Sequence, residues 1–157
     1  MQSFMDTYLI PAEKIWQQIG AEHPAFWSLD KKNGIEKAFC CVYAIPRDYA
    51  KLGRLILNNG KVNDVQVVSK TFLDECLVPN PTLEKDGKKN KRYGMHFWIG
   101  THQKERFVHF QGLYGQYIVV LPKQNTIIVR TGRKSEPNND SGLPNDLYKY
   151  IEIAKKM

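Results

Sequence analysis

The sequence predicts an α+β fold, an antiparallel β-sheet meander with flanking helices. Helical periodicities come first along the chain, apolar runs of strand length follow, and an amphipathic stretch closes it. Helices and strands that are segregated in this way favour an antiparallel sheet over alternating βαβ units. With 157 residues and 42% hydrophobic content, the chain is long enough for one domain with a real core and short for two. We therefore expect residues 1–157 to form a single domain.

The first part of the chain carries the longer helical signals. Apolar residues recur at helical spacing over the first 20 residues, where Pro11 must kink or restart the helix and Gly20 fits its end. The clearest helix begins at Pro46, because the fixed φ of proline suits a first turn, and it ends at Asn58-Asn59-Gly60. Between these helices, residues 36–45 indicate extended or irregular buried chain.

Shorter elements follow the second helix. Residues 61–66 have the pattern of a small hairpin with Asn63-Asp64 at its turn. Ser69 can cap a short helix that reaches about Leu77, and apolar residues over 147–154 predict a closing amphipathic helix.

The strand signals lie in the second half of the chain. Residues 93–99 alternate as a strand, residues 106–111 form another, and residues 112–130 form a β-hairpin. β-Branched residues dominate both arms of that hairpin, and the segment Pro122-Lys-Gln-Asn125 supplies its turn. This hairpin is the segment most committed to one shape.

Charge and hydropathy limit the partners to be expected. The net charge is +7, but the basic residues of segment 85–92 lack interleaved aromatic residues, which favours a solvated loop over a nucleic-acid site. A second basic cluster, Arg130, Arg133 and Lys134, precedes a polar stretch and also indicates a surface loop. Neither a membrane-spanning run nor a signal peptide is visible.

The cysteines predict neither a disulfide framework nor a metal centre. Cys40 and Cys41 are adjacent and Cys76 is distant, a spacing that matches no ligand motif. We therefore expect three buried thiols, no metal and no cofactor.

Residues Ser28-Leu-Asp-Lys31 have the Ser-x-x-Lys spacing, which on a helix places a lysine amine beside a nucleophilic hydroxyl. Here the pattern runs into the polar segment 30–34 instead of an apolar helix, so a turn is favoured over a catalytic pair. A new catalytic pair formed by Ser28 and Lys31 is kept as the less favoured alternative.

The hairpin of residues 112–130 resembles the last hairpin of the penicillin-recognising serine hydrolases, the family of class C β-lactamases, penicillin-binding DD-peptidases and related esterases and amide hydrolases. The likeness continues in the family's order along nearly the whole chain. The similar segments are 27–30, 36–41, 47–60, 67–69, 93–98 and 112–116. This resemblance implies the β-lactamase/transpeptidase-like fold, of which this chain would form the C-terminal portion.

The resemblance also implies a chemistry. Members of the family hydrolyse amides or esters through an acyl-enzyme, with a serine nucleophile, a lysine and a tyrosine. Their Ser-x-x-Lys and tyrosine motifs lie upstream of the portion that this chain resembles. The chain is therefore expected to be a C-terminal fragment without a complete catalytic set, inactive alone, whose parent acts on a small amide or ester. The alternative is a non-catalytic β-lactamase-like domain that works as a binding or interaction module.

We identify the candidate site residues by their positions relative to the family's motifs. Arg130-Thr-Gly132 mimics the family's Lys-Thr-Gly triad but lies a full hairpin too late, and the triad's place falls on residues 107–112. Gln116 is expected to shape the turn, and Arg47 with Asp48 to start a helix and form an ion pair. The substrate-facing or oxyanion-side candidates are His109, Gln111, Gly112 and Leu113.

In this family, strands from the N-terminus complete the sheet. Without them a sheet edge and an apolar face would be uncovered, through which copies of the chain could self-associate. Family members are commonly exported to the periplasm or cell envelope, but any export signal would precede this portion. The compartment and the identity of the substrate therefore stay open.

Overall fold

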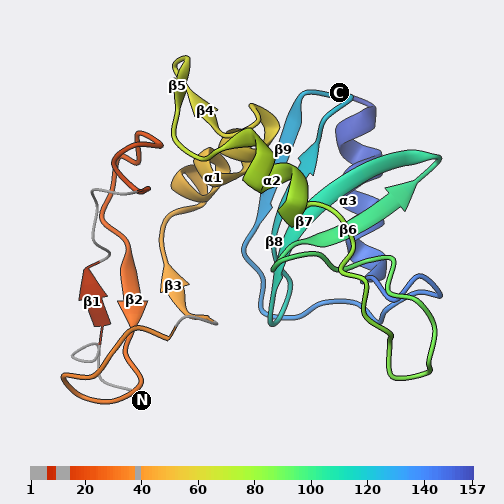
Figure 1. Cartoon of the computed structure of the whole chain (residues 1–157), viewed down its shortest axis with the longest axis horizontal. Coiled ribbons are helices and arrows are strands. Elements are labelled where there is room, and N and C mark those ends of the chain that lie inside the picture. Colours follow the sequence, from red (N-terminus) through yellow and green to blue (C-terminus); the bar gives the residue numbers. More distant parts are fainter. Residues whose placement is uncertain (1–6, 10–14, 38–39) are drawn as a thin grey trace.

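The computed structural model of the chain describes residues 7–9, 15–37 and 40–157 (Figure 1). Its main element is a four-stranded antiparallel sheet in the order β6-β7-β8-β9, so each strand pairs with the next one along the chain. The strands are β6 (Trp98–His102), β7 (Glu105–Gly112), β8 (Gln116–Leu121) and β9 (Thr126–Arg130). This meander with its flanking helices confirms the predicted α+β fold and the predicted hairpin.

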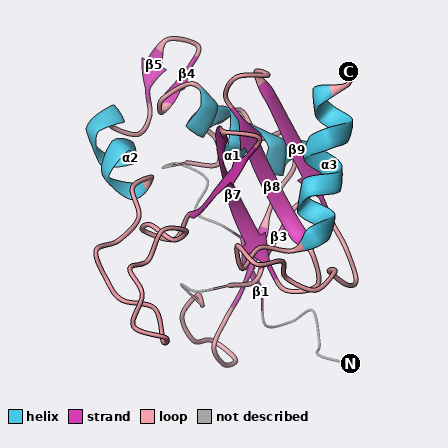
Figure 2. Cartoon of the chain, turned by 90° about the vertical axis from the view of Figure 1, so that its right-hand side faces the viewer, coloured by secondary structure: helices cyan, strands magenta, loops and turns pink. Residues whose placement is uncertain are grey.

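Helix α3 (Asn145–Lys155) covers one face of the sheet. Side chains that alternate along β7 and β8 point to this face and form a core with α3 and with Leu143, two residues before it. The fully buried members are Phe107, Tyr117, Val119, Leu121, Leu143, Leu147 and Ile151. Figure 2 shows α3 running along the sheet on the side opposite to α1. The prediction of the closing helix is confirmed. Its apolar face packs against the sheet.

Helix α1 (Pro46–Leu57) covers the other face, where it contacts β8 and β9. A Cβ atom on Gly53 would lie 2.7 Å from Cγ2 of Ile127 and 3.0 Å from Cγ2 of Ile118, so glycine allows this close approach. Pro46 begins the helix as predicted, and the left-handed Asn59 and Gly60 follow its end. Apolar residues on both sides of the sheet are therefore removed from water.

Two shorter predictions are also confirmed. Ser69 caps α2 (Lys70–Cys76), since its Oγ accepts a hydrogen bond of 3.3 Å from the backbone N–H of Phe72. Strands β4 (Lys61–Val62) and β5 (Val65–Gln66) pair around Asn63 and Asp64, which both have positive φ, as a tight hairpin turn requires.

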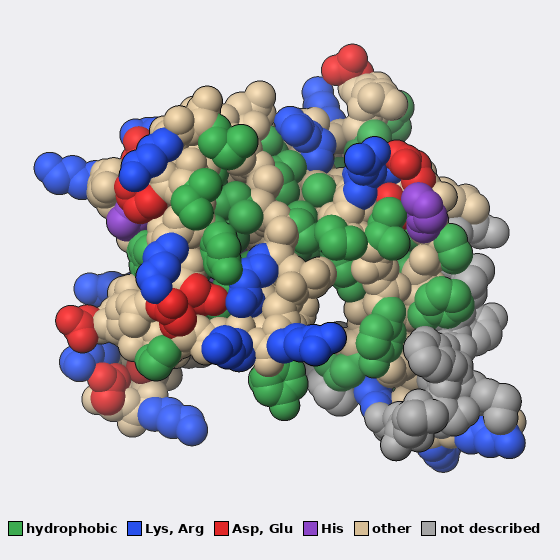
Figure 3. Space-filling model, turned by 180° about the vertical axis from the view of Figure 1, so that it is seen from behind, with side chains coloured by type: hydrophobic (Ala, Val, Ile, Leu, Met, Phe, Trp, Pro, Cys, Tyr) green, Lys and Arg blue, Asp and Glu red, His purple; other side chains and the backbone are tan. Residues whose placement is uncertain are grey.

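A second small sheet stands apart from the main one. It consists of β1 (Thr7–Leu9), β2 (Phe26–Ser28) and β3 (Val42–Tyr43) in antiparallel order. Figure 3 shows an opening between the part of the molecule that carries this sheet and the part that carries β6 to β9. Residues 36–45 were predicted to be buried, but Tyr43 in β3 is 57% exposed, because this sheet presents one side to solvent.

The carboxylate of Asp48 joins the segment before β2 to α1. It is fully buried and accepts hydrogen bonds from the backbone N–H groups of Glu22 (2.9 Å) and His23 (3.0 Å). Lys51, one turn along the helix, lies 3.3 Å from it. Burial opposes ionisation, but these donors outweigh it and lower the pKa of Asp48 below its ordinary value. The predicted role of Asp48 in an ion pair at the helix start is confirmed, with Lys51 instead of Arg47 as the partner that the structure shows.

The helix predicted over the first 20 residues is wrong at residues 7–9, although its predicted end at Gly20 is confirmed. Thr7–Leu9 form β1 and pair with β2, because strand pairing with a distant segment overrides a local helical pattern. A helical turn does end at Gly20, whose φ is 71°, with hydrogen bonds from Gly20 N to Gln17 O and from Ala21 N to Trp16 O. Pro11 lies outside the described residues.

Two further sequence interpretations are corrected. Cys40 and Cys41 form a disulfide with each other instead of two buried thiols, while Cys76 is a buried free thiol as expected. The strand predicted over residues 93–99 begins only at Trp98, because His96 has a φ of 62° and turns the chain. Both features depend on local backbone geometry that the residue pattern does not reveal.

Replacing Asp48 by Ala should lower the free energy of unfolding by about 2 to 3 kcal/mol, because two backbone donors and Lys51 lose a buried acceptor. Urea denaturation at neutral pH measures this loss. Asp74→Ala is the matched control, since Asp74 is an exposed partner of Lys70 on α2, and we expect a change below about 0.5 kcal/mol.

The pH dependence of the free energy of unfolding also tests the role of Asp48. The folded-state pKa of Asp48 is lowered, so its contribution is complete above the unfolded-state pKa near 4 and is lost as the pH falls through the folded-state value. The stability difference between wild type and Asp48→Ala should shrink in that window. A difference that is independent of pH down to pH 2 would contradict this role.

Candidate functional site

The candidate site residues lie at the end of β7 and in the turn that follows it. Gly112 is the last residue of β7 and pairs with Gln116, the first residue of β8. Leu113 in the turn between them is 80% exposed, Tyr114 is also exposed, and Gln111 is half-buried. The structure therefore brings Gln111, Gly112 and Leu113 together at one end of the sheet.

His109 is set apart from the other three because it is fully buried. Its ring stacks on Trp98 of β6, with centroids 6.4 Å apart, and lies 5.6 Å from the ring of Phe107. Its Nε2 atom lies 3.1 Å from Oε1 of Gln111 two residues along the same face of β7. His109 therefore reaches the exposed end of β7 through the Gln111 side chain.

Burial also fixes the protonation of His109. Desolvation lowers its pKa to about 4, against a smaller opposing effect of the Gln111 hydrogen bond. The ring is neutral at pH 7, and because Gln111 Oε1 is an acceptor, Nε2 carries the proton and donates it. Nδ1 has no hydrogen-bond partner among the described residues. With its oxygen engaged, the Gln111 amide has its NH₂ group left to donate elsewhere.

Gln116 holds the other side of the turn. Its Oε1 accepts a hydrogen bond of 3.1 Å from the backbone N–H of Gly132, and its Nε2 donates to the carbonyl of the same residue. This paired contact ties the start of β8 to the chain that follows β9. This structural contact agrees with the expectation that Gln116 shapes the turn.

Arg130 supports the turn from β9. Its guanidinium donates to the carbonyls of Gly115 and Lys134 and to the Tyr150 hydroxyl of α3. It also lies 3.7 Å from the carboxylate of Asp146. Gly115 has a φ of 80°, and a Cβ atom there would overlap the guanidinium. The Arg-Thr-Gly segment thus braces the backbone of the turn, and the interpretation of Arg130 as part of a surface loop is wrong.

Tyr117 connects this brace to the core. Its hydroxyl donates to Asp146 Oδ1 at 3.1 Å, and burial together with the Asp146 charge raises its pKa to about 12. The sequence pattern did not indicate Asp146 or Tyr150 as partners of the turn, because both lie on α3 and meet it only in the folded chain. Tyr114 is a further exposed residue of this turn, and its position between Gly112 and Gly115 is the sequence signal that indicates it.

Ser28 and Lys31 do not meet as a catalytic pair would. Ser28 is the last residue of β2, and a turn follows in which the Asp30 carboxylate accepts hydrogen bonds from the N–H groups of Lys31 (2.8 Å) and Ile35 (3.0 Å). The predicted turn is confirmed, and the spacing does not place hydroxyl and amine on one helical turn.

The end of β7 thus offers backbone groups, an amide donor and an exposed apolar side chain. Such groups can orient a polar substrate, but they hold no nucleophile. The described residues include no group of three or more His, Cys, Asp or Glu placed to hold a metal ion. Within the same residues, no helix is long and apolar enough to cross a membrane.

The pKa of His109 predicts a specific pH dependence of stability. An unfolded histidine binds a proton near pH 6.5 and the folded one only near pH 4, so stability is lost as the pH falls between these values. Between these pH values the free energy of unfolding of wild type should fall by about 3 kcal/mol more than that of His109→Gln, as urea denaturation measures. The exposed His96 provides the matched control His96→Asn. Equal pH profiles for wild type and His109→Gln would refute the buried neutral ring.

Among the solved structures that resemble this chain are two bacterial proteins. A proposed 6-aminohexanoate-dimer hydrolase from Bacillus anthracis is 28% identical, with a TM-score of 0.71 over 91% of this chain. A proposed β-lactamase from Bacteroides dorei is 12% identical, with a TM-score of 0.58 over 89% of this chain. This chain spans only 36% of the first protein and 49% of the second.

No protein-family model matches this sequence, and no curated protein matches it. The likeness therefore rests on three-dimensional structure, supported by the identity with the Bacillus anthracis protein. The antiparallel meander, the helices on both of its faces and these two neighbours together show that the chain has the serine β-lactamase-like fold and is related to hydrolases of that fold.

Proposed function

We propose that this chain is the C-terminal part of a serine hydrolase domain that cleaves an amide or ester through an acyl-enzyme. In this proposal residues 1–157 belong to one domain, whose nucleophilic serine, lysine and tyrosine come from a preceding part. The chain supplies the sheet and one wall of the active site. Alone it is inactive.

One observation carries the proposal. The chain aligns over 91% of its own length with a hydrolase structure at 28% identity, yet it spans 36% of that protein. A fold alone does not establish a function, but identity along almost the whole chain raises the expectation of a shared activity. The separation of Ser28 from a helical Ser-x-x-Lys geometry agrees with a nucleophile located elsewhere.

The proposed wall is the end of β7. The backbone around Gly112 and Leu113 would form one side of the oxyanion hole, and the Gln111 amide would donate to a substrate oxygen. His109 lies behind Gln111 and fixes which end of the amide points outward. Leu113 offers an apolar contact to the part of the substrate next to the scissile bond.

The substrate we propose is a small linear amide, because the more similar neighbour is named for the hydrolysis of a 6-aminohexanoate dimer. The exposed Leu113 can contact the methylene groups of such a substrate, and the Gln111 amide can donate to its carbonyl oxygen. The proposal needs no cofactor.

A binding module without catalysis is the second candidate. β9 is an edge of the main sheet, and its middle residues Ile127, Ile128 and Val129 are half-buried. An edge of this kind accepts a further strand, from a preceding segment of the parent or from a second copy. A sheet edge that is open to pairing would therefore suit a domain that binds another protein chain.

Fluorophosphonate labelling separates the two candidates. This chain should remain unlabelled, with Ser28→Ala as its matched control, while a protein extended upstream in the coding sequence should be labelled on an upstream serine. The extended protein should be labelled at a rate at least on the order of a thousandfold above that of this chain, since this chain lacks the nucleophile. Labelling at Ser28 that Ser28→Ala abolishes would overturn the fragment proposal, and an unlabelled extended protein would favour the binding module.

Light scattering tests the exposed edge. We expect the isolated chain to associate as its concentration rises, with slower amide exchange in β9 than in the dilute protein. Exchange in β8, which is already paired on both sides, is the internal control. A chain that stays monomeric at all concentrations, with unchanged exchange in β9, would argue against an edge available for pairing.

A further inference from the structure

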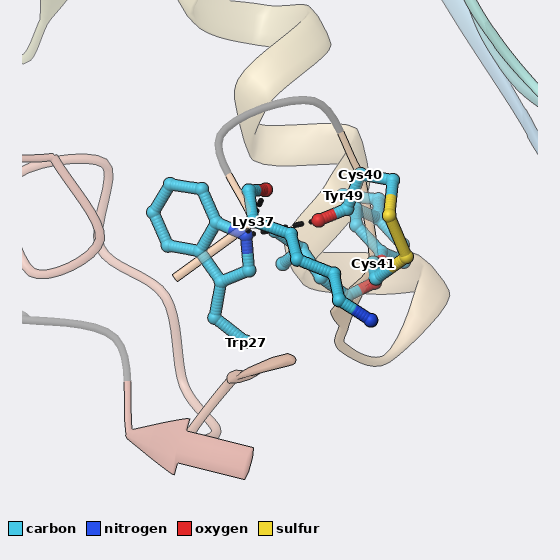
Figure 4. The surroundings of a disulfide bond; sticks show 6 residues. Trp27, Lys37, Cys40, Cys41 and Tyr49 are labelled. Atoms are coloured by element: carbon cyan, nitrogen blue, oxygen red, sulfur yellow. Dashed lines mark hydrogen bonds between the residues drawn. A yellow bond between two sulfur atoms is a disulfide. The ribbon is translucent and has the colours of Figure 1, made fainter. Parts of the chain in front are cut away.

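The disulfide between Cys40 and Cys41 lies directly before β3, and the proposed hydrolase function does not use it (Figure 4). Cys41 is exposed and Cys40 is half-buried, so reagents in solution can reach the pair. The free Cys76 differs, because it is buried and its pKa is raised by desolvation. The chain therefore holds one accessible sulfur pair and one protected thiol.

An adjacent pair stabilises a fold very little by restricting the unfolded chain. The gain from a disulfide grows with the number of residues in the loop that it closes, and here no residue lies between the two cysteines. The consequence of this bond must therefore be local, on the backbone of residues 40 and 41.

That backbone is a joint between three elements. The indole N–H of Trp27 in β2 donates to the carbonyls of Lys37 and Cys40, both at 2.9 Å. The N–H of Ser28 donates to the carbonyl of Cys41 at 3.0 Å. On the far side, the hydroxyl of Tyr49 in α1 donates to the carbonyl of Val42 at 2.6 Å. The orientation of the Cys40 and Cys41 carbonyls thus positions β3 between β2 and α1.

Cys41 has a φ of 76°, a left-handed conformation that residues other than glycine, asparagine and aspartate rarely adopt. The ring closed by two adjacent cysteines couples the two backbones, so Cys41 cannot leave this conformation alone. If the ring opens, we expect Cys41 to return to the extended region, which would turn its carbonyl away from the Ser28 N–H.

We propose that Cys40–Cys41 is a reversible thiol–disulfide exchange site for a dithiol reductant, and that its redox state sets the geometry of the joint between β2 and β3. The thiolate of the reductant attacks Sγ of the exposed Cys41, a mixed disulfide forms, and the electron pair of the broken bond leaves on Cys40 Sγ, which then takes up a proton. The second thiol of the reductant displaces Cys41 as a thiolate, and the reductant ends as a disulfide. Two electrons pass to the protein, and reoxidation reverses the steps.

Alkylation of the native wild-type chain tests the exchange. After equilibration with mixtures of reduced and oxidised dithiothreitol and a brief iodoacetamide quench, mass spectrometry should find no alkyl group on the oxidised chain and two on the reduced one. Denaturation of the reduced chain should expose the third thiol, Cys76. Reoxidation should restore the Cys40–Cys41 bond without disulfides between chains. Resistance of the native pair to reduction, or disulfide-linked dimers on reoxidation, would overturn the proposal.

Hydrogen exchange tests the structural consequence. The Ser28 amide should exchange roughly tenfold faster in the reduced chain, because its acceptor turns away, while amides of β8 should not change. The double variant Cys40→Ser, Cys41→Ser should match the reduced wild type at every dithiothreitol ratio, and Cys76→Ala should respond as wild type does. Equal exchange in both redox states of wild type would refute the switch, even if the double variant fails to fold.

Discussion

Burial of β8 on both faces is the constraint on which the rest of the structure depends. Five successive residues, from Tyr117 to Leu121, are removed from water, so the strand needs an apolar layer on each side. α3 supplies one layer and α1 the other, and Gly53 lets α1 come close enough to do so. Because β8 is paired with β7 and β9 as well, the turn between β7 and β8 starts from a rigid base.

That base explains why polar side chains gather around the turn. Backbone groups at the end of a buried sheet still need hydrogen-bond partners, and Gln116 and Arg130 provide them. Asp146 and Tyr150 hold the guanidinium in place from α3. A cation that is engaged by several partners supports the backbone of the turn and has fewer donors left for other contacts.

The sequence predicted the elements whose signals are local. Proline at the start of α1, the serine cap of α2 and the β-branched arms of the hairpin each act within a few residues, and all three are confirmed. β1 and the partners of Arg130 could not be predicted, because they arise from pairing with distant segments. The candidate site residues were selected by resemblance, yet the burial of His109 depends on Trp98 and Val119 in neighbouring strands.

The burial of His109 also limits what it can do in the proposed hydrolase. A ring with a pKa near 4 that already donates its Nε2 proton to Gln111 is a weak base at neutral pH, and no substrate can touch it while it is fully buried. Its effect on catalysis must pass through Gln111. With the proton on Nε2, the ring binds the amide oxygen of Gln111 and leaves the NH₂ group outward, and a fixed donor stabilises developing negative charge without reorganisation. In this wall the histidine orients a hydrogen bond and transfers no proton.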